Sequence, residues 1–566
     1  MTYLCYDIRG IQDFIFRTPK LASIISGSAT VDVFDRRFVP QLESRMPGVK
    51  LIYAGGGKGA FAVEGDEAVS KLRDTIRGKA GEEGLDVRFG IDGDYSKAAH
   101  CADELYPYLP GGEALTAYPC AAGSGYCAAA EGETSELYEQ RARRGPGSGS
   151  RHFEEAYFED LDLGPEFGIG QTDWSFFHDL DKVKEDRGGE GRSPLGPSNR
   201  FAVICMDGND IGAQFRAASH AYGEGSAELQ AWTSHVGSAL CEVTQESTKA
   251  AVEGAVRRWA PREASKQEDN LGAYRERRNG DGGGRRTGPV VVPVRPLLMG
   301  GDDVKIICHV AEAMQFVADL AKRFDRLSTE VDDRVRHEAV GLKNGLWLAT
   351  GGRLSISAGI LYCGTSTPLH TAIEYAESLL ASAKGRGRAL LGERSGEPAP
   401  ACVDFEVVHE GLLDAPADRR RRRLVFLDGD DRQRCIRLTR KPYRLLDEAG
   451  DGGAVADLRD LAKRLPQSQS LRNQLTRGLR AGLDERALLL ARLAKRSEAA
   501  GLVKGLEVNG ETLGDWWVLD DADAAERPAG QPPSIATGLL DAIELSDEEL
   551  EGRESAAELE GAHIDG

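Results

Sequence analysis

Residues 296–308 read Pro-Leu-Leu-Met-Gly-Gly-Asp-Asp-Val-Lys-Ile-Ile-Cys, and this stretch decides the fold. An apolar segment runs into Gly300 and Gly301, continues through Asp302 and Asp303, and ends in a second apolar segment. The pattern predicts a β-hairpin whose glycines permit a tight turn and the close approach of a ligand. Two adjacent carboxylates repel each other, and Mg²⁺ or Mn²⁺ usually offsets such repulsion because both ions prefer carboxylate oxygens and bridge phosphates. An acidic, solvated hairpin tip is the alternative interpretation of these residues alone.

A second stretch, residues 201–212, supplies a third carboxylate. It reads Phe-Ala-Val-Ile-Cys-Met-Asp-Gly-Asn-Asp-Ile-Gly, which is typical of a buried strand that ends in Asp207 and turns into a helix. In a palm-type βαββ unit this strand lies beside the hairpin, so Asp207 would join Asp302 and Asp303. Three carboxylates on two adjacent strands can hold two metal ions, one to activate a hydroxyl and one to steady a triphosphate leaving group. Asp210, in the turn, is a candidate nucleotide-binding residue, as are the two glycines of the hairpin.

Residues 374–384 supply a candidate cation. The sequence Glu-Tyr-Ala-Glu-Ser-Leu-Leu-Ala-Ser-Ala-Lys is typical of an amphipathic helix that ends in Lys384. Lys384 is therefore a candidate for binding the triphosphate of a nucleotide. The alternative is that a lysine at a helix end only makes a favourable contact with the helix dipole.

Residues 3–16 and 51–63 repeat the two acidic stretches in the same order. Cys5-Tyr6-Asp7 aligns with Cys205-Met206-Asp207, and each is followed by a turn and the apolar start of a helix. The two hairpin tips also align: Gly55 with Gly300, Gly56 with Gly301, Gly57 with Asp302 and Lys58 with Asp303. We predict two copies of one βαββ unit, of which only the second has the carboxylate pair. The first copy would be non-catalytic but would bind a nucleotide through Gly55, Gly56, Gly57 and Lys58. Chance similarity of two short glycine-rich hairpins is the alternative.

The order of predicted elements indicates an α+β protein. Each copy reads as a ferredoxin-like sheet with helices on one face. The predicted domains are a first palm domain without the carboxylate pair (1–95), a connector (96–199), a second palm domain with Gly-Gly-Asp-Asp (200–395), a short β element with a helical C-terminal domain (396–515) and an acidic, disordered tail (516–566). Within the second palm, the polar and glycine-rich residues 262–289 predict a disordered insertion. Within the tail, only a short helix near 541–551 is expected.

The net charge of −20 is unevenly distributed over the 566 residues. From position 520 onward there are fourteen acidic and two basic residues, so the acidity is concentrated in the tail. The whole-chain charge argues against a broad nucleic-acid-binding surface. Residues 419–423 are five consecutive arginines and form a candidate basic patch, with a solvated strand edge as the alternative.

The ten cysteines are scattered, and several fall inside predicted strands. This distribution suits reduced thiols in the cytoplasm better than a disulfide framework. His100, Cys101, Cys120 and Cys127 could bind zinc, but they lack paired Cys-x-x-Cys knuckles, so we expect no zinc. There is no apolar run long enough to span a membrane and no signal-type N-terminus, so we expect a cytoplasmic protein with no membrane partner.

Taken together, the motifs resemble one known family over roughly residues 1–515. The order of Gly-Ile-Gln-Asp-Phe-Ile-Phe, the Gly-Gly-Gly-Lys hairpin, Asp-Gly-Asn-Asp-Ile-Gly and Gly-Gly-Asp-Asp is similar to the large polymerase-like subunit of type III CRISPR effector complexes. The resemblance implies two nucleotidyl-cyclase-like palm domains that pack as a pseudo-dimer, with ATP between them. It implies synthesis of cyclic oligoadenylate messengers with Mg²⁺ or Mn²⁺. It assigns metal binding to Asp207, Asp302 and Asp303, with Asp302 and Asp303 as the catalytic pair, and triphosphate binding to Lys384.

The sequence departs from this family in three respects. Many members begin with a histidine-aspartate nuclease domain, whereas this chain starts at the first palm, so we expect no cleavage of single-stranded DNA by such a domain. The connector lacks the family's four-cysteine ribbon, and the acidic tail has no counterpart. Two settings stay open: a subunit that works with other effector subunits, guide RNA and target RNA, or a stand-alone homo-oligomeric cyclase of the same lineage.

Two alternative functions also stay open. A diguanylate-cyclase-like enzyme would use GTP, but such enzymes pair two active palms, and this chain has one active and one altered copy. A scaffold that binds guide RNA–protein subunits or a nucleotide without turnover needs no clustered carboxylates. We therefore favour the ATP-using cyclase.

Overall fold

The structure of the protein is a computed structural model. It describes residues 1–16, 21–103, 157–158, 174–177, 200–223, 226–264, 275–279, 285–338, 342, 344–392, 396–408, 415–421, 424–426, 435–446, 455–465, 468–480, 517–520 and 534–546. Among these residues, no helix is both long and apolar enough to cross a bilayer.

The first palm domain is a four-stranded antiparallel sheet in the order β2-β3-β1-β4. Its elements are β1 (Thr2–Arg9), α1 (Ile11–Phe16), α2 (Leu21–Val33), a π-helix (Phe34–Phe38), α3 (Gln41–Arg45), β2 (Val49–Gly55), β3 (Lys58–Val63), α4 (Asp66–Glu83), β4 (Asp86–Asp92) and α5 (Tyr95–Asp103). Alternate residues of β1 face opposite sides of the sheet, as the period of a strand requires. Leu4, Tyr6 and Ile8 pack with α1, α2 and α4, whereas Cys5 packs with α5.

The second palm domain has the same strand order at its centre. Its sheet runs β15-β12-β11-β6-β10-β9. The elements are β6 (Arg200–Gly208), α9 (Ile211–Tyr222), α10 (Ala227–Ala264), β9 (Val294–Gly300), β10 (Asp303–Cys308), α11 (Ala313–Glu338), β11 (Ile356–Gly364), α12 (Leu369–Leu391), β12 (Cys402–Val407) and β15 (Tyr443–Arg444). The strands β11-β6-β10-β9 repeat β4-β1-β3-β2 of the first palm, so the predicted ferredoxin-like repeat is confirmed.

The two faces of the second sheet have different partners. Ile204 and Met206 pack with α10 and α11, and the intervening residues Val203 and Cys205 pack with α12 and with α1 and α2 of the first palm. Asp207 follows the same alternation, which puts it on the α12 face of the sheet.

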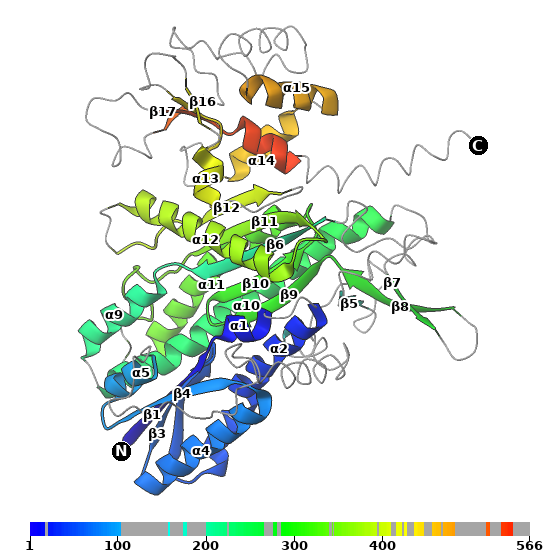
Figure 1. The fold of residues 1–566 in the computed structure, drawn as a ribbon. Helices are drawn as coiled ribbons and strands as arrows, with labels where there is room; N and C mark the ends of the chain where they lie inside the picture. Colours follow the sequence, from blue (N-terminus) through cyan, green and yellow to red (C-terminus); the bar gives the residue numbers. More distant parts are fainter. Residues whose placement is uncertain are drawn as a thin grey trace, which may run out of the picture.

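The two palms pack against each other as the predicted pseudo-dimer (Figure 1). Helix α10 of the second palm contacts β2 of the first, and α2 of the first palm contacts β9 of the second. The Gln230 amide donates a hydrogen bond of 2.7 Å to the Tyr3 hydroxyl across this interface. The hairpin tips also meet, because a Cβ placed on Gly300 would lie 3.7 Å from the Cα of Gly56.

Strand β12 extends the second sheet beyond the predicted boundary at residue 395. We expected it within the C-terminal β element, but it pairs in parallel with β11. The chain reaches it through α12, which makes the β-α-β crossover that parallel neighbours require. The sequence pattern predicts a strand at this position, but it does not show that the strand pairs with β11.

The arginine run is neither a basic patch nor a strand edge where the structure describes it. Residues 416–421 form α13 (Pro416–Arg421), and the side chains of Arg419 and Arg420 form ion pairs with carboxylates of β12. Arg419 lies 3.1 Å from Glu406, and Arg420 binds Asp404. Both carboxylates are buried, so these two arginines neutralise internal charges.

The prediction of a disordered tail is wrong for residues 517–520 and 534–540, whereas the helix predicted near 541–551 is present over its described part, residues 541–546. The first range is strand β16 (Trp517–Asp520), and the second contains β17 (Ser534–Thr537) and the start of a helical segment at 539–546. They complete a sheet with β13 (Leu424–Phe426) and β14 (Cys435–Arg437), near helices α14 (Val455–Arg464) and α15 (Gln469–Arg480). The helical segment buries Leu539, Leu540, Ile543 and Leu545, and Asp541 accepts a 2.7 Å hydrogen bond from the Tyr443 hydroxyl. The acidic composition of the tail gave no indication of strands β16 and β17.

The predicted disordered insertion at 262–289 is also partly ordered. Helix α10 continues to Ala264, and residues 275–279 and 285–292 form strands β7 (Arg275–Asn279) and β8 (Arg285–Val292). Strand β8 pairs in parallel with β5 (Trp174–Phe176) from the connector. These strands were not predicted because residues 262–289 are rich in glycine and arginine and lack the alternation of apolar and polar residues that is typical of strands.

Candidate functional site

The two hairpin tips have the same strand register, although both central residues of the first turn have a positive φ and in the second only Gly301 does. Gly300 pairs with Asp303 in the second palm, and Gly55 pairs with Lys58 in the first, so each turn has two central residues. Gly301 has a φ of +60°, which a side chain rarely adopts. The predicted alignment of Lys58 with Asp303 is therefore confirmed by the register of the strands.

Asp207 and the hairpin carboxylates come from neighbouring strands. Met206 of β6 pairs with Val304 of β10, and one further step along both strands brings Asp207 to the level of Asp303. Asp302 lies against the same strand end, because a Cβ on Gly208 would be 2.9 Å from its Oδ2 atom. The structure thus brings the three predicted aspartates to one edge of the second sheet.

Burial and repulsion raise the pKa of Asp302 well above its usual value. Loss of water is the largest cause, and the charge and hydrogen bonding of Asp207 add to it. Burial also raises the pKa of Asp303, although the Lys305 ammonium opposes this shift. These are the shifts expected of carboxylates that are buried close to one another.

Two lysines offset part of this negative charge. Lys384 of α12 donates hydrogen bonds to the Asp207 carboxylate and, over 2.8 Å, to the carbonyl oxygen of Gly208. Lys305 of β10 lies 3.2 Å from Asp303 Oδ2 and 2.8 Å from Glu377 Oε1. Lys384 is thus placed at the aspartates, and its binding of a triphosphate stays a prediction.

The Asp210 side chain accepts a backbone hydrogen bond that fixes the turn after β6. Its φ of 61° lies in the left-handed region, and its Oδ2 atom accepts a hydrogen bond of 2.8 Å from the Ala399 backbone N–H. The Asn209 amide binds the same segment, donating to the Ala399 carbonyl oxygen over 3.4 Å, and it also donates to Ser355 Oγ over 2.8 Å. The turn after β6 is therefore fastened to the segment before β12, and nucleotide binding by Asp210 stays a prediction.

The donor set fits a hard divalent cation. Carboxylate oxygens are the ligands that Mg²⁺ and Mn²⁺ prefer, and a cation would relieve the repulsion that raises the pKa of Asp302. In the part of the chain that the structure describes, however, no three His, Cys, Asp or Glu side chains are gathered as a metal cluster. The predicted three-carboxylate cradle is thus not assembled in this form, because lysines engage Asp207 and Asp303. Of the candidate zinc ligands, Cys120 and Cys127 lie outside the described residues.

In the first palm, the equivalent aspartate has cationic partners of its own. Asp7 lies 2.9 Å from Arg9 Nε and 4.0 Å from Lys58 Nζ. Asp7 and Lys58 are direct partners in the β1–β3 ladder. The first palm therefore balances the charge of Asp7 internally, whereas the second palm retains excess negative charge at the same place.

Asp35 is a buried residue of the first palm that sequence reasoning missed. Its carboxylate accepts hydrogen bonds from the backbone N–H of Gly57 over 2.6 Å and from the Tyr6 hydroxyl over 2.9 Å. Burial raises the pKa of Asp35 to about 7. The contact holds the first hairpin in place. The available signal was the pair of acidic residues, Asp32 and Asp35, in the otherwise apolar segment 31–35.

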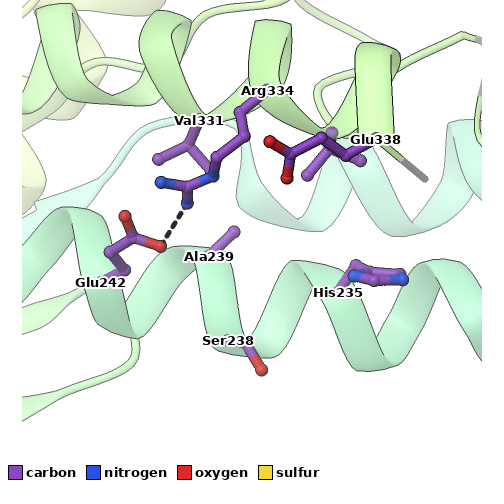
Figure 2. A pocket seen from close by; sticks show the side chains of 8 residues that line it. His235, Ser238, Ala239, Glu242, Val331, Arg334 and Glu338 are labelled. Atoms are coloured by element: carbon purple, nitrogen blue, oxygen red, sulfur yellow. Dashed lines mark hydrogen bonds and ion pairs between the residues drawn. The ribbon is translucent and has the colours of Figure 1, made fainter.

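A shallow groove lies elsewhere, between α10 and α11. Figure 2 shows Arg334 of α11 reaching across it to Glu242 of α10, with 2.5 Å between Arg334 Nη2 and the Glu242 carboxylate. The remaining labelled side chains come from the same two helices. These helices cover the face of the sheet opposite to α12, so the groove is separate from the aspartate site.

The segment that carries the aspartates matches a known family. Residues 200–391 match the family model described as Cas10/Cmr2, second palm domain. The match confirms the predicted resemblance to the large subunit of type III CRISPR effector complexes, and it covers Asp207, Asp302, Asp303 and Lys384 of this palm.

Solved Csm1–Csm4 structures are similar to this protein over 97% of its length. A Csm1–Csm4 cassette in complex with cA4 covers 97% of this chain and 69% of its own, at 15% identity and a TM-score of 0.41. The Csm1–Csm4 subcomplex of the type III-A CRISPR-Csm interference complex covers 97% and 70%, at 15% identity and a TM-score of 0.43. No curated protein matches the chain. The assignment to the family rests on the palm-domain match.

Replacing Gly208 with alanine should disturb the Cas10/Cmr2 palm site selectively. The new Cβ would lie 2.9 Å from Asp302 Oδ2 and 3.0 Å from Asp302 Cβ, so the carboxylate must move. We expect Mn²⁺ binding, measured by electron paramagnetic resonance, to weaken about tenfold, the lower end of what disturbing the groups around a metal typically costs. Gly212→Ala is the control, because its Cβ would meet only Arg216 Nη1, at 3.6 Å. Equal Mn²⁺ affinity of both variants would contradict the placement of Asp302.

Replacing Asp35 with asparagine should change the pH dependence of stability. Between about pH 4, the ordinary pKa of an aspartate, and about pH 7, folded Asp35 is protonated and unfolded Asp35 is ionised. The folded state binds the extra proton, so this residue's contribution to stability falls as pH rises through that window, by at most about 4 kcal/mol. Asp35→Asn cannot titrate and should gain stability relative to the wild type as pH rises.

Chemical denaturation at several pH values measures this difference. Asp74→Asn is the control, since the Asp74 side chain is 61% exposed. Parallel pH profiles for the wild type and Asp35→Asn would show that the buried carboxyl does not titrate as described.

Proposed function

We propose that this protein is a nucleotidyltransferase that converts ATP into cyclic oligoadenylates as part of a type III CRISPR-like antiviral defence. The observation that carries the proposal is the Cas10/Cmr2 second-palm match over the segment that holds Asp207, Asp302 and Asp303. The catalytic pair is Asp302 and Asp303, and the proposed metal ligands are these two residues and Asp207.

The proposed reaction joins two nucleotides and then closes a ring. The 3′-hydroxyl oxygen of one ATP attacks the α-phosphorus of another, the bond from that phosphorus to the bridging oxygen breaks, and pyrophosphate leaves. The hydroxyl proton passes to solvent water in the same step. Mg²⁺ or Mn²⁺, when bound, supplies charge neutralisation and lowers the pKa of the attacking hydroxyl. The aspartates would hold and orient that ion, and we propose that Lys384, which pairs with Asp207 in this structure, moves to the phosphates.

The arrangement of the palms supports two neighbouring nucleotides. Gly56 and Gly300 meet at the interface, so the turn residues Gly55, Gly56, Gly300 and Gly301 lie in the same region. The Lys58 side chain is 46% exposed and lies at the tip of the first hairpin. We assign to the first palm the binding of a nucleotide through Lys58 and the backbone of Gly55 and Gly56, without catalysis. The predicted role of Gly57 is not supported, because its N–H is bonded to Asp35 and its carbonyl oxygen to the Ile8 N–H.

The choice of ATP and the cellular setting rest on the family. Csm1–Csm4 has been crystallised with ATP, cA3 and cA4. For this chain we propose ATP as substrate, other effector subunits with guide RNA and target RNA as partners, and a cytoplasmic location. Incubation of the purified protein with ATP and Mn²⁺, alone and with its co-purifying partners, should give cyclic products by mass spectrometry. A GTP-only product would favour the diguanylate-type alternative, and no product with the complete complex would refute the proposal.

Replacing both Asp302 and Asp303 with alanine should abolish synthesis and leave the fold intact. Loss of metal ligands should raise the barrier by about 4 kcal/mol or more, which corresponds to at least roughly 10³-fold in rate. The melting temperature should stay close to that of the wild type, because the relief of repulsion between two carboxylates is offset by the loss of one partner of the buried Lys305, which keeps Glu377. Asp207→Ala should be similarly inactive, and Asp7→Ala should be milder because Asp7 is balanced by Arg9 and Lys58.

Product formation and a thermal melt are measured for each variant. Full activity of the double variant would remove the catalytic assignment. A collapsed melt with residual activity in the folded fraction would instead indicate a structural role for the pair.

A further inference from the structure

Lys305 is the most deeply buried cation near the aspartate site. Its side chain is 1% exposed, and its Nζ atom lies between two carboxylates, 2.8 Å from Glu377 Oε1 and 3.2 Å from Asp303 Oδ2. Phe16, the last residue of α1 in the first palm, covers it, with 5.5 Å between Nζ and the ring centroid. Burying an ammonium group costs free energy unless carboxylates pair with it. The two carboxylates therefore determine where Lys305 Nζ lies.

The local structure explains why these three groups meet. Asp303 and Lys305 are two residues apart on β10, so both side chains fall on the α12 face of the sheet. Glu377 and Lys384 are seven residues apart on α12, which is about two helical turns, so they share one side of that helix. Helix α12 thus presents an anion to β10 and a cation to the end of β6.

We infer that Lys305 and Glu377 are positioning residues that fix the Asp303 carboxylate for a divalent cation. Lys305 holds Asp303 through one oxygen, and Glu377 holds Lys305 from the opposite side. The inference rests on the proposed function only in that the aspartates bind a divalent cation. Neither residue touches the substrate in this account.

A charge-neutral exchange separates positioning from electrostatics. The cluster contains four carboxylates (Asp207, Asp302, Asp303 and Glu377) and two ammonium groups (Lys305 and Lys384). The double variant Lys305→Met/Glu377→Gln removes one charge of each sign, so the sum stays the same. A purely electrostatic role would be preserved in this variant, whereas the support of Asp303 would be lost.

The test compares Mn²⁺ binding by electron paramagnetic resonance with melting of the metal-free protein. Each single variant leaves a buried charge without its partner and should lower the melting temperature, whereas the double variant should recover most of it. The double variant should still bind Mn²⁺ about 10- to 100-fold more weakly than the wild type, as expected when the groups behind a metal ligand are removed. Lys322→Met/Glu374→Gln, on exposed positions of α11 and α12, is the matched control and should leave both values unchanged.

Three outcomes would overturn the inference: wild-type Mn²⁺ affinity in the folded double variant, the same loss in the control, or no Mn²⁺ binding by the wild type. If the double variant does not fold, the single variant Glu377→Gln is used instead, because that side chain is 31% exposed. A Mn²⁺ affinity of Glu377→Gln equal to that of Glu374→Gln would then overturn the inference. Weakened Mn²⁺ binding without any product from the wild type would support the positioning role and refute the proposed cyclase.

Discussion

Repulsion among the carboxylates at one edge of the second sheet is the constraint that orders this part of the molecule. Asp207 and the hairpin pair are brought together by the antiparallel register of β6 and β10, with Asp302 in contact with the Gly208 position. Their mutual charge and their burial raise the pKa of Asp302 and Asp303. Helix α12 contributes one lysine and one glutamate to the cluster, and β10 contributes a second lysine. The negative excess that remains is the physical reason to expect a cation at this edge.

The two palms differ in how they neutralise the negative charge at this position. Both have an aspartate at the end of the first strand and a glycine hairpin beside it. In the first palm, Arg9 and Lys58 neutralise Asp7 within the domain. In the second palm, the position of Lys58 is taken by Asp303, which adds charge instead of removing it. The same fold thus gives one copy in which the aspartate is neutralised and one copy that keeps excess negative charge at the same place.

Much of this arrangement could be predicted from the sequence, because it depends on local patterns. The glycine pairs, the strand ending in Asp207 and their recurrence around Asp7 are read from consecutive residues, and the sheets confirm them. The partnerships of Lys305, Glu377 and Asp35 could not be predicted, since each joins elements that are distant in the chain. The strands β16 and β17 near the C-terminus were missed because the acidic composition of the tail concealed short apolar segments such as Trp517–Leu519. Asp210 was placed with the nucleotide by proximity in sequence, and only the packing reveals its contact with Ala399.

The most direct test of the central claim is diffraction at the manganese absorption edge from crystals of the chain grown with Mn²⁺ and a non-hydrolysable ATP analogue. The account predicts anomalous density bounded by Asp207, Asp302 and Asp303, with the triphosphate beside it and Lys384 released from Asp207. Manganese bound elsewhere, with Lys384 still on Asp207, would contradict it.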